Sequence, residues 1–170
     1  LITGGQRSGK SMYAERLALS LTDQPIYFAT ARIWDEEFKE RVKRHQARRG
    51  DNWTNIEEEK YLSHHTIYNK VCVVDCITLW CTNFFFDANQ NNPKEPVIDE
   101  ALDAIKKEFD QFTAQDATFI FVTNEIGSGG VSDNVVQRRF TDMEGWMNQY
   151  VASKADEVVL MVSGIPVKIK

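Results

Sequence analysis

The chain has 170 residues, of which 42% are hydrophobic and 26% are charged, and its formal net charge at neutral pH is −5. These values suit one compact domain, residues 1–170, with a full hydrophobic core and no second domain. The negative charge argues against nonspecific binding to nucleic acid or to an anionic membrane, and no apolar run is long enough to span a bilayer.

The chain starts without a methionine, inside an expected strand, so we expect a few further residues upstream. Its three cysteines, Cys72, Cys76 and Cys81, do not have the spacing of a zinc site. We expect them to be small buried residues. An odd number of cysteines, together with the lack of a secretory leader, favours a reducing cytoplasm.

The first expected element is a strand ending at Leu1–Thr3, and the sequence GGQRSGKS follows it directly. This stretch fits the pattern G-x-x-x-x-G-K-[ST] of a phosphate-binding P-loop. Its glycines let successive N–H groups point at phosphate oxygens, Lys10 can reach the β- and γ-phosphates, and the Ser11 hydroxyl can ligate Mg²⁺. An expected helix begins next, with its positive end facing the same anion. The residues expected to bind the phosphates are Gly4, Gly5, Gln6, Arg7, Ser8, Gly9, Lys10 and Ser11.

A short buried strand is expected over 25–30, followed by a polar helix over 35–49. In that helix, His45 falls on the same face as the apolar residues Trp34, Phe38 and Val42. A histidine on an apolar face is usually structural. Arginines nevertheless flank this one within a turn on either side, so the pattern alone leaves a catalytic and a structural role equally open.

Residues 53–57 are expected to form an extended segment at a sheet edge, and the acidic run Glu57–Glu59 a solvated surface. We assign no role to His64 or His65. Four apolar residues ending in an acid, Val71–Asp75, have the form of a Walker B strand, whose carboxylate orders Mg²⁺ or its waters.

The second half of the chain continues the alternation of helices and strands. We expect helices over 78–86 and 98–112 around a polar loop at 89–96, then a buried strand over 118–123. The polar, glycine-rich stretch 124–130 follows that strand, where open α/β sheets bind ligands. Asp133 suits the N-cap of a long helix over 136–150.

Two last strands, 157–162 and 165–169, are expected to pair as a hairpin around the turn Ser163–Gly164. The sequence therefore predicts an α/β fold with a mostly parallel sheet flanked by helices and antiparallel strands at one edge.

Several motifs occur together in a set order and extend over essentially the whole chain. Together they resemble the bifunctional adenosylcobinamide kinase / adenosylcobinamide-phosphate guanylyltransferase family of cobalamin synthesis. The motifs are GGQRSGKS, YFATA, the D-x-E-x-x-x-R-x-x-x-H run that ends at His45, DCIT, VTNEIGSG and the ending ADEVVLMVSGIPVKIK. Asp75 stands where some relatives have glutamate, and this shorter acid can act through a water.

The resemblance implies two reactions. A nucleoside triphosphate, ATP or GTP, phosphorylates the aminopropanol hydroxyl of adenosylcobinamide. GMP from GTP is then joined to that phosphate through a guanylylated histidine, which gives adenosylcobinamide-GDP and pyrophosphate. The histidine matches His45, with Arg41 or Arg49 stabilising the transition-state oxygens and Ser11 and Asp75 holding Mg²⁺.

The family also implies contacts from Thr30, Ala31, Arg32 and Glu57 to the guanine nucleotide, a RecA-like P-loop NTPase fold and a homotrimer. The aromatic run Phe84–Phe86 can serve either core packing or a subunit contact. Two alternatives remain at this point. The protein can be a kinase only, with a structural His45, or a nucleotide-binding regulatory module without catalysis.

Overall fold

The computed structural model describes residues 1–33, 36, 39–40, 46–47 and 49–170. The elements in chain order are β1 (Ile2–Gly4), α1 (Lys10–Leu21), β2 (Ile26–Ala29), β3 (Thr54–Glu57), η1 (Leu62–His64), β4 (Val71–Asp75), α3 (Ile77–Ala88), α4 (Asp99–Thr113), β5 (Thr118–Val122), η2 (Ile126–Gly129), α5 (Val135–Lys154), β6 (Val159–Val162) and β7 (Ile165–Lys168). Strands and helices alternate as expected until the closing hairpin.

The seven strands form one sheet in the order β3-β2-β4-β5-β1-β6-β7. Pairing is parallel throughout except between β6 and β7. This arrangement confirms the predicted mostly parallel α/β sheet with an antiparallel edge, consistent with a P-loop NTPase-like fold. The segment expected at an edge, 53–57, lies there as β3.

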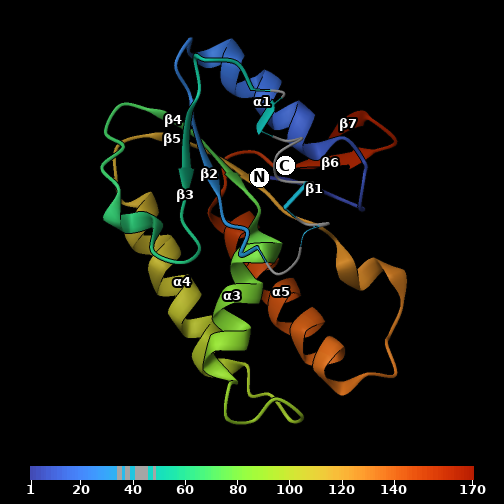
Figure 1. The fold of residues 1–170 in the computed structure, drawn as a ribbon. Helices are drawn as coiled ribbons and strands as arrows, with labels where there is room; N and C mark the ends of the chain where they lie inside the picture. The colour runs from blue at the N-terminus through green and yellow to red at the C-terminus, as the bar shows by residue number, and fades with distance from the viewer. Residues whose placement is uncertain (34–35, 37–38, 41–45, 48) are drawn as a thin grey trace.

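Helices cover both faces of the sheet. Figure 1 shows α1 on one side of the strands and α3, α4 and α5 on the other. Alternate residues of each central strand reach opposite layers: Cys72 and Val74 of β4 pack with α3, α4 and α5, whereas Val73 packs with α1. Because both faces are covered, the strands read as continuous apolar runs rather than as an alternating pattern.

The three cysteines are buried free thiols, as expected: Cys72 lies in β4, Cys81 in α3 and Cys76 at the N-cap of α3. The aromatic run in α3 divides between core and surface, since Phe84 and Phe85 are buried and Phe86 is 46% exposed. None of the described helices combines the length and the apolar character that crossing a bilayer requires.

The predicted N-cap of the long helix is wrong by one residue. The cap is Asn134, whose side-chain oxygen accepts a hydrogen bond from the N–H of Gln137 three residues later. Asp133 lies one position too early to reach that donor, so the helix begins at Val135.

The register of the parallel strands brings their carboxyl ends together along one end of the strands, which we call the carboxyl edge of the sheet. Asp75 of β4 lies opposite Ala29 of β2 and Val122 of β5, and Ile2 of β1 also pairs with Val122. The segments that follow these strands therefore meet in a row, which is where ligands bind in open α/β sheets.

Candidate active site

The phosphate-binding loop connects β1 to α1 with the backbone curvature that its glycines predict. Gly4 has φ +145° and Gly9 has φ +98°, both in the region that favours glycine. A Cβ on Gly4 would lie 2.5 Å from the carbonyl oxygen of Met161, so no side chain fits there. Gly5, Gln6 and Arg7 form the exposed crest of the loop.

Lys10 opens α1 and is only 7% exposed. Its Nζ donates a hydrogen bond to the carbonyl oxygen of Gly5 at 2.6 Å, across the mouth of the loop. Burial lowers the pKa of Lys10, and the nearby Cys76 and Asp75 oppose that effect. The Lys10 ammonium therefore lies inside the loop, where it could contact a bound phosphate. Ser11 follows it in the first turn and is half-buried.

The C-terminal hairpin packs directly against this loop. The N–H of Gly164 donates to the carbonyl oxygen of Ser8 at 2.9 Å. A Cβ on Gly9 would meet the Cα of Gly164 at 3.4 Å. The turn between β6 and β7, which carries the motif VSGIPVKIK, therefore supports the outer wall of the phosphate loop. The hydroxyl oxygen of Ser8 is buried and has no hydrogen-bond partner among the described residues.

Asp75 lies at the end of β4 with its carboxylate fixed from β2. The Tyr27 hydroxyl donates to Asp75 Oδ2 at 2.7 Å. Burial first, and then the Asp75 charge, raise the pKa of Tyr27 well above its ordinary value, so Tyr27 stays a neutral donor. The carboxylate of Asp75, which the sequence predicts to bind a metal, is thus held in one orientation at the carboxyl end of β4.

The guanidinium of Arg49 lies 3.5 Å from the centre of the Tyr27 ring. Its Nε donates to Asn55 Oδ1 at 2.6 Å, and its Nη1 lies 3.7 Å from Glu15 of α1. The side chain is only 2% exposed. In this structure Arg49 packs on Tyr27 and is hydrogen-bonded through Nε, whereas its Nη1 has no hydrogen-bond partner among the described residues. A role for it on transition-state oxygens stays a prediction.

The residues after β2 are fixed by contacts to β4 and α3. The Thr30 hydroxyl exchanges hydrogen bonds with the backbone of Cys76, and Asn83 donates to the Thr30 carbonyl. Ala31 is half-buried. Arg32 forms ion pairs with Glu59 and Asp87 at 2.7 and 2.8 Å.

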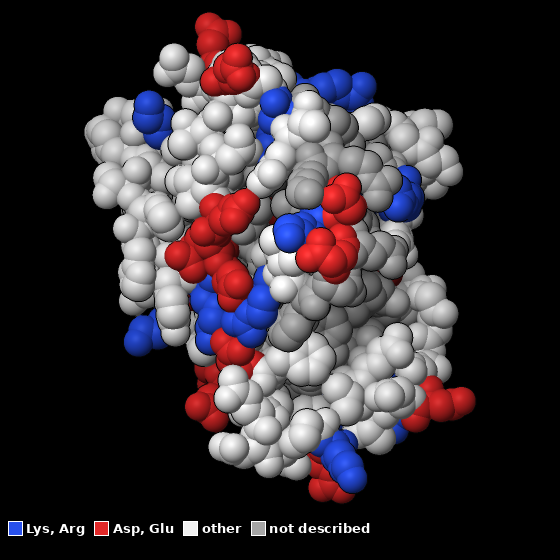
Figure 2. All heavy atoms as spheres, viewed as in Figure 1, with Lys and Arg blue, Asp and Glu red and all other residues white. Residues whose placement is uncertain are grey.

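Glu57, at the end of β3, is exposed and accepts a hydrogen bond from Gln46. On the face in Figure 2, described basic side chains lie among acidic ones rather than forming a separate basic surface.

The stretch after β5, where the sequence predicts a ligand site, contacts the phosphate loop. The N–H of Glu125 donates to the carbonyl oxygen of Gly4 at 3.2 Å, and the Thr3 hydroxyl donates to Glu125 Oε1 at 2.5 Å. Glu125 also lines a hollow of about 430 Å³ together with the loop residues 4–8. No pattern in the sequence points to Thr3 as a partner, because this contact joins residues far apart in the chain.

A buried polar network lies between α3, α5 and the segment that follows β5. Glu144 of α5 is 1% exposed and accepts hydrogen bonds from the hydroxyls of Thr78 and Thr123. Thr78 in turn accepts hydrogen bonds from the backbone and side-chain nitrogens of Asn124. Burial raises the pKa of Glu144 to about 7, and hydrogen bonds from the neighbouring polar groups oppose that rise. The sequence showed Glu144 only as one polar position of an amphipathic helix.

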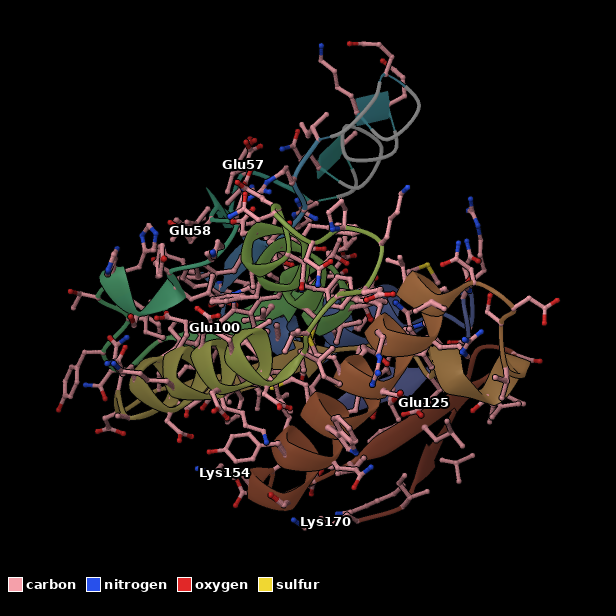
Figure 3. The ribbon with its side chains drawn as sticks, turned by 90° about the horizontal axis from the view of Figure 1, so that it is seen from below. Glu57, Glu58, Glu100, Glu125, Lys154 and Lys170 are labelled. Atoms are coloured by element: carbon pink, nitrogen blue, oxygen red, sulfur yellow. The ribbon has the colours of Figure 1, made fainter. Side chains whose placement is uncertain are left out.

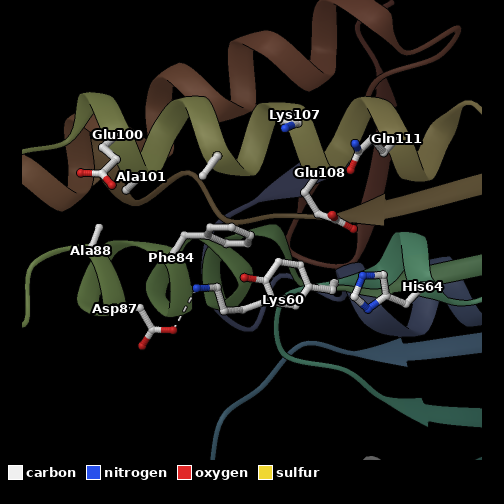
Figure 4. Close-up of a pocket in the computed structure, with 12 residues that line it drawn as sticks. Lys60, His64, Phe84, Asp87, Ala88, Glu100, Ala101, Lys107, Glu108 and Gln111 are labelled. Carbon is white, nitrogen blue, oxygen red and sulfur yellow. Dashed lines mark hydrogen bonds and ion pairs between the residues drawn. The ribbon is translucent and has the colours of Figure 1, made fainter.

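A second hollow, of about 450 Å³, lies between α3, α4 and η1 (Figure 4). Its wall carries the Lys60–Asp87 ion pair and the stacked rings of Tyr61 and His64. None of the residues predicted for the site lines it. His65 pairs with Glu58 at 3.6 Å, and both described histidines have packing partners.

Two predicted catalytic residues, His45 and Arg41, lie outside the described residues, as does most of the expected helix 35–49. The described part of that segment is helical at Glu36, Lys39, Glu40, Gln46 and Ala47. The described residues contain no cluster of three or more His, Cys, Asp or Glu side chains that could bind a metal alone. A magnesium ion here would depend on phosphate oxygens for part of its coordination.

Comparison with known proteins covers nearly the whole chain. Residues 1–169 match the sequence profile of a family described as "Cobinamide kinase / cobinamide phosphate guanyltransferase". The chain is 38% identical to the "Bifunctional adenosylcobalamin biosynthesis protein CobU" of Escherichia coli (strain K12), over all of the chain and 98% of that protein. It is 37% identical to the protein of the same description in Salmonella typhimurium, with the same coverage. It is 34% identical to "Bifunctional adenosylcobalamin biosynthesis protein CobP" of Pseudomonas aeruginosa, over all of the chain and 96% of that protein.

Proposed function

The chain belongs to the cobinamide kinase / cobinamide phosphate guanyltransferase family, and from that premise we propose how its residues divide the work of the two reactions. The enzyme has both activities that the family description names. The observation that carries the proposal is the phosphate loop, whose glycine geometry and buried Lys10 are suited to a nucleoside triphosphate.

In the first reaction a nucleoside triphosphate phosphorylates the aminopropanol hydroxyl of adenosylcobinamide. The loop N–H groups hold the phosphates, and Lys10 neutralises charge on the β- and γ-phosphates as the bond to the leaving group breaks. The buried position of Lys10 supports this role, because a charge in a water-poor site acts on its neighbour with less screening.

Two residues at the carboxyl edge of the sheet are suited to bind a magnesium ion. Ser11 and Asp75 offer a hydroxyl and a carboxylate, the hard oxygen ligands that Mg²⁺ prefers, and the bond from Tyr27 holds the carboxylate in place. When bound, the ion would supply positive charge to the oxygens of the leaving phosphate. Tyr27 contributes orientation alone, because it stays a neutral hydroxyl.

In the second reaction we assign the nucleophile to His45. A neutral imidazole nitrogen forms a bond to the α-phosphorus of GTP, and pyrophosphate leaves with the electrons of the broken P–O bond. An oxygen of adenosylcobinamide phosphate then displaces the imidazole and gives adenosylcobinamide-GDP. Arg41 and Arg49 are the proposed cations for the transition-state oxygens, and Thr30–Arg32 and Glu57 the proposed contacts to the guanine nucleotide.

Labelling with GTP that carries ³²P at the α-phosphate tests this assignment. The protein has three histidines in all, so a phosphoramidate that is stable to base and lost in acid has few positions to occupy. We expect His45→Ala to abolish the label while ATP-dependent phosphorylation of adenosylcobinamide continues. His64→Ala is the matched control, because His64 is exposed and stacks on Tyr61 away from the phosphate loop.

The two alternatives give different results. A kinase with a structural His45 would show no label in the wild-type protein and no release of pyrophosphate from GTP with adenosylcobinamide phosphate. A regulatory module would bind GTP without turning over either substrate. A label that persists in His45→Ala protein would move the nucleophile to another residue.

We also propose a homotrimer working in the cytoplasm. Phe86 is the member of the aromatic run whose exposed ring can reach a second copy, whereas Phe84 and Phe85 belong to the core. Light scattering at micromolar concentration measures the mass directly, and a monomeric mass in the active protein would exclude the trimer.

A further inference from the structure

Phosphorylation of a hydroxyl requires a group that accepts the hydroxyl proton, whereas transfer of GMP to a phosphate does not. An aliphatic hydroxyl keeps its proton at neutral pH, so the proton must leave as the new O–P bond forms. A phosphate monoester has a second pKa of about 6 and already offers an ionised oxygen. One residue can therefore be needed for one reaction of this enzyme and dispensable for the other.

The carboxylates at the carboxyl edge of the sheet differ in what they can reach. Asp75 accepts the Tyr27 hydroxyl and is assigned to the metal. Glu144 is 1% exposed and lies beneath the carboxyl ends of the strands, so its side chain has almost no surface to offer a substrate. Glu57 ends the edge strand β3, and Figure 3 shows it well away from Glu125. Of these four carboxylates, Glu125 is the one that lies against the phosphate loop.

The position of Glu125 coincides with the end of the loop where a γ-phosphate belongs. A P-loop lysine reaches the β- and γ-phosphates. Here the Nζ of Lys10 lies 2.6 Å from the carbonyl oxygen of Gly5, so Gly5 marks that end of the loop. Gly5 and Glu125 line the same hollow of about 430 Å³. A hydroxyl in line with the γ-phosphate would enter through this hollow.

Two contacts hold Glu125 there. Its backbone N–H is bonded to the Gly4 carbonyl, and its Oε1 accepts the hydroxyl of Thr3, which is buried in β1. The side chain itself is half-buried. One carboxylate oxygen is thus anchored to the strand that carries the loop, and the residue faces the hollow.

We propose that Glu125 is the general base of the kinase reaction and has no part in guanylyl transfer, an inference that depends on the proposed two-reaction function. The O–H bond of the substrate hydroxyl breaks and its proton passes to the Glu125 carboxylate. The same oxygen bonds to the γ-phosphorus while the bond from that phosphorus to the bridging oxygen breaks. The nucleoside diphosphate leaves with that electron pair, and Glu125 later returns the proton to water.

The test separates the two activities in one protein. Glu125→Gln keeps an oxygen that can accept the Thr3 hydroxyl but cannot take a proton. We expect its kinase kcat, measured with ATP and adenosylcobinamide, to fall by about 10²- to 10⁴-fold. Guanylyl transfer, measured as pyrophosphate release from GTP with adenosylcobinamide phosphate, should stay within about threefold of wild type. A carboxylate beside an anionic acceptor is unfavourable, so its neutralisation gives no reason for a slower transfer.

Glu100→Gln is the matched control, because Glu100 is exposed at the start of α4 and lines the other hollow (Figure 4). Both of its activities should equal those of wild type. If Glu125→Gln melts below the assay temperature, Glu125→Asp replaces it, with a smaller fall confined to the kinase reaction.

Equal losses in both reactions, or no loss in either, would overturn the role of Glu125 while leaving the proposed function standing. A wild-type protein that does not phosphorylate adenosylcobinamide would instead overturn the proposed function itself. The retained guanylyl transfer of the variant also shows that its fold is intact, so a kinase-specific loss cannot come from unfolding.

Discussion

Glu144 makes the stability of the protein depend on pH in a window where most carboxylates have no effect. The side chain is 1% exposed, and its partners in the described network are hydroxyl and amide groups rather than a cation. Burial raises its pKa from the ordinary 4.5 to about 7. Replacing it by glutamine keeps a similar volume and an oxygen that accepts the Thr78 hydroxyl, and it removes the titration.

The sign of the effect follows from the protons bound in each state. Between pH 4.5 and about 7 the unfolded chain has lost the Glu144 proton and the folded protein keeps it, so the free energy of unfolding falls as the pH rises. Each pKa unit is worth about 1.4 kcal/mol, and the difference between 4.5 and about 7 therefore corresponds to about 3 kcal/mol. The cost is absent below pH 4.5 and complete above pH 7.

Urea unfolding of wild type and Glu144→Gln at pH values from 4.5 to 8 measures this effect. We expect the variant to gain stability relative to wild type by up to about 3 kcal/mol across the window, most of it between pH 5 and 7. Taking the difference between the two proteins cancels the groups that they share. A difference in unfolding free energy that stays constant with pH would refute the burial of a protonated Glu144.

Three further predictions concern the loop and the core. Gly4→Ala should weaken nucleotide binding at least tenfold by calorimetry, because its Cβ would lie 2.5 Å from a carbonyl oxygen of β6. Gly145→Ala, within α5 and with open space around it, should bind normally and gain about 0.5–1 kcal/mol of stability in urea. Lys10→Ala should lower the turnover of both reactions by about 10²-fold or more, and a loss confined to one would contradict a shared loop. Phe85→Ala should cost about 3–5 kcal/mol in urea unfolding, whereas Phe86→Ala, at the surface, should cost far less; equal costs would be inconsistent with the observed burial.

The part of this molecule that the sequence predicts well is the part with local causes. The stretch Gly4–Ser11 runs from the end of β1 through a short loop into α1, as the spacing of its glycines and lysine within eight residues predicts. The apolar run before Asp75 likewise predicts β4 and the location of its acid. Even the edge position of β3 follows from its polar, half-exposed pattern.

The contacts that the sequence could not predict join elements across the sheet. The Tyr27 hydroxyl reaches Asp75 because β2 pairs with β4, and the Arg49 guanidinium stacks on the Tyr27 ring. Thr3 and Glu125 are 122 positions apart and meet only because β1 pairs with β5. Glu144 looks like any polar helix position until α5 packs against α3. Strand order and helix packing decide these contacts, and no local sequence pattern records either one.

The support that the β6–β7 turn gives to the phosphate loop has a consequence for synthesis of the protein. The ribosome makes Gly4–Ser11 about 150 residues before the Ser163–Gly164 turn, although the two touch in the folded molecule. A nascent chain cannot complete its phosphate loop until the hairpin has left the exit tunnel, so nucleotide binding should begin only from that point of synthesis. A prematurely terminated chain that lacks the hairpin would then carry every residue of the loop and still lack a competent one.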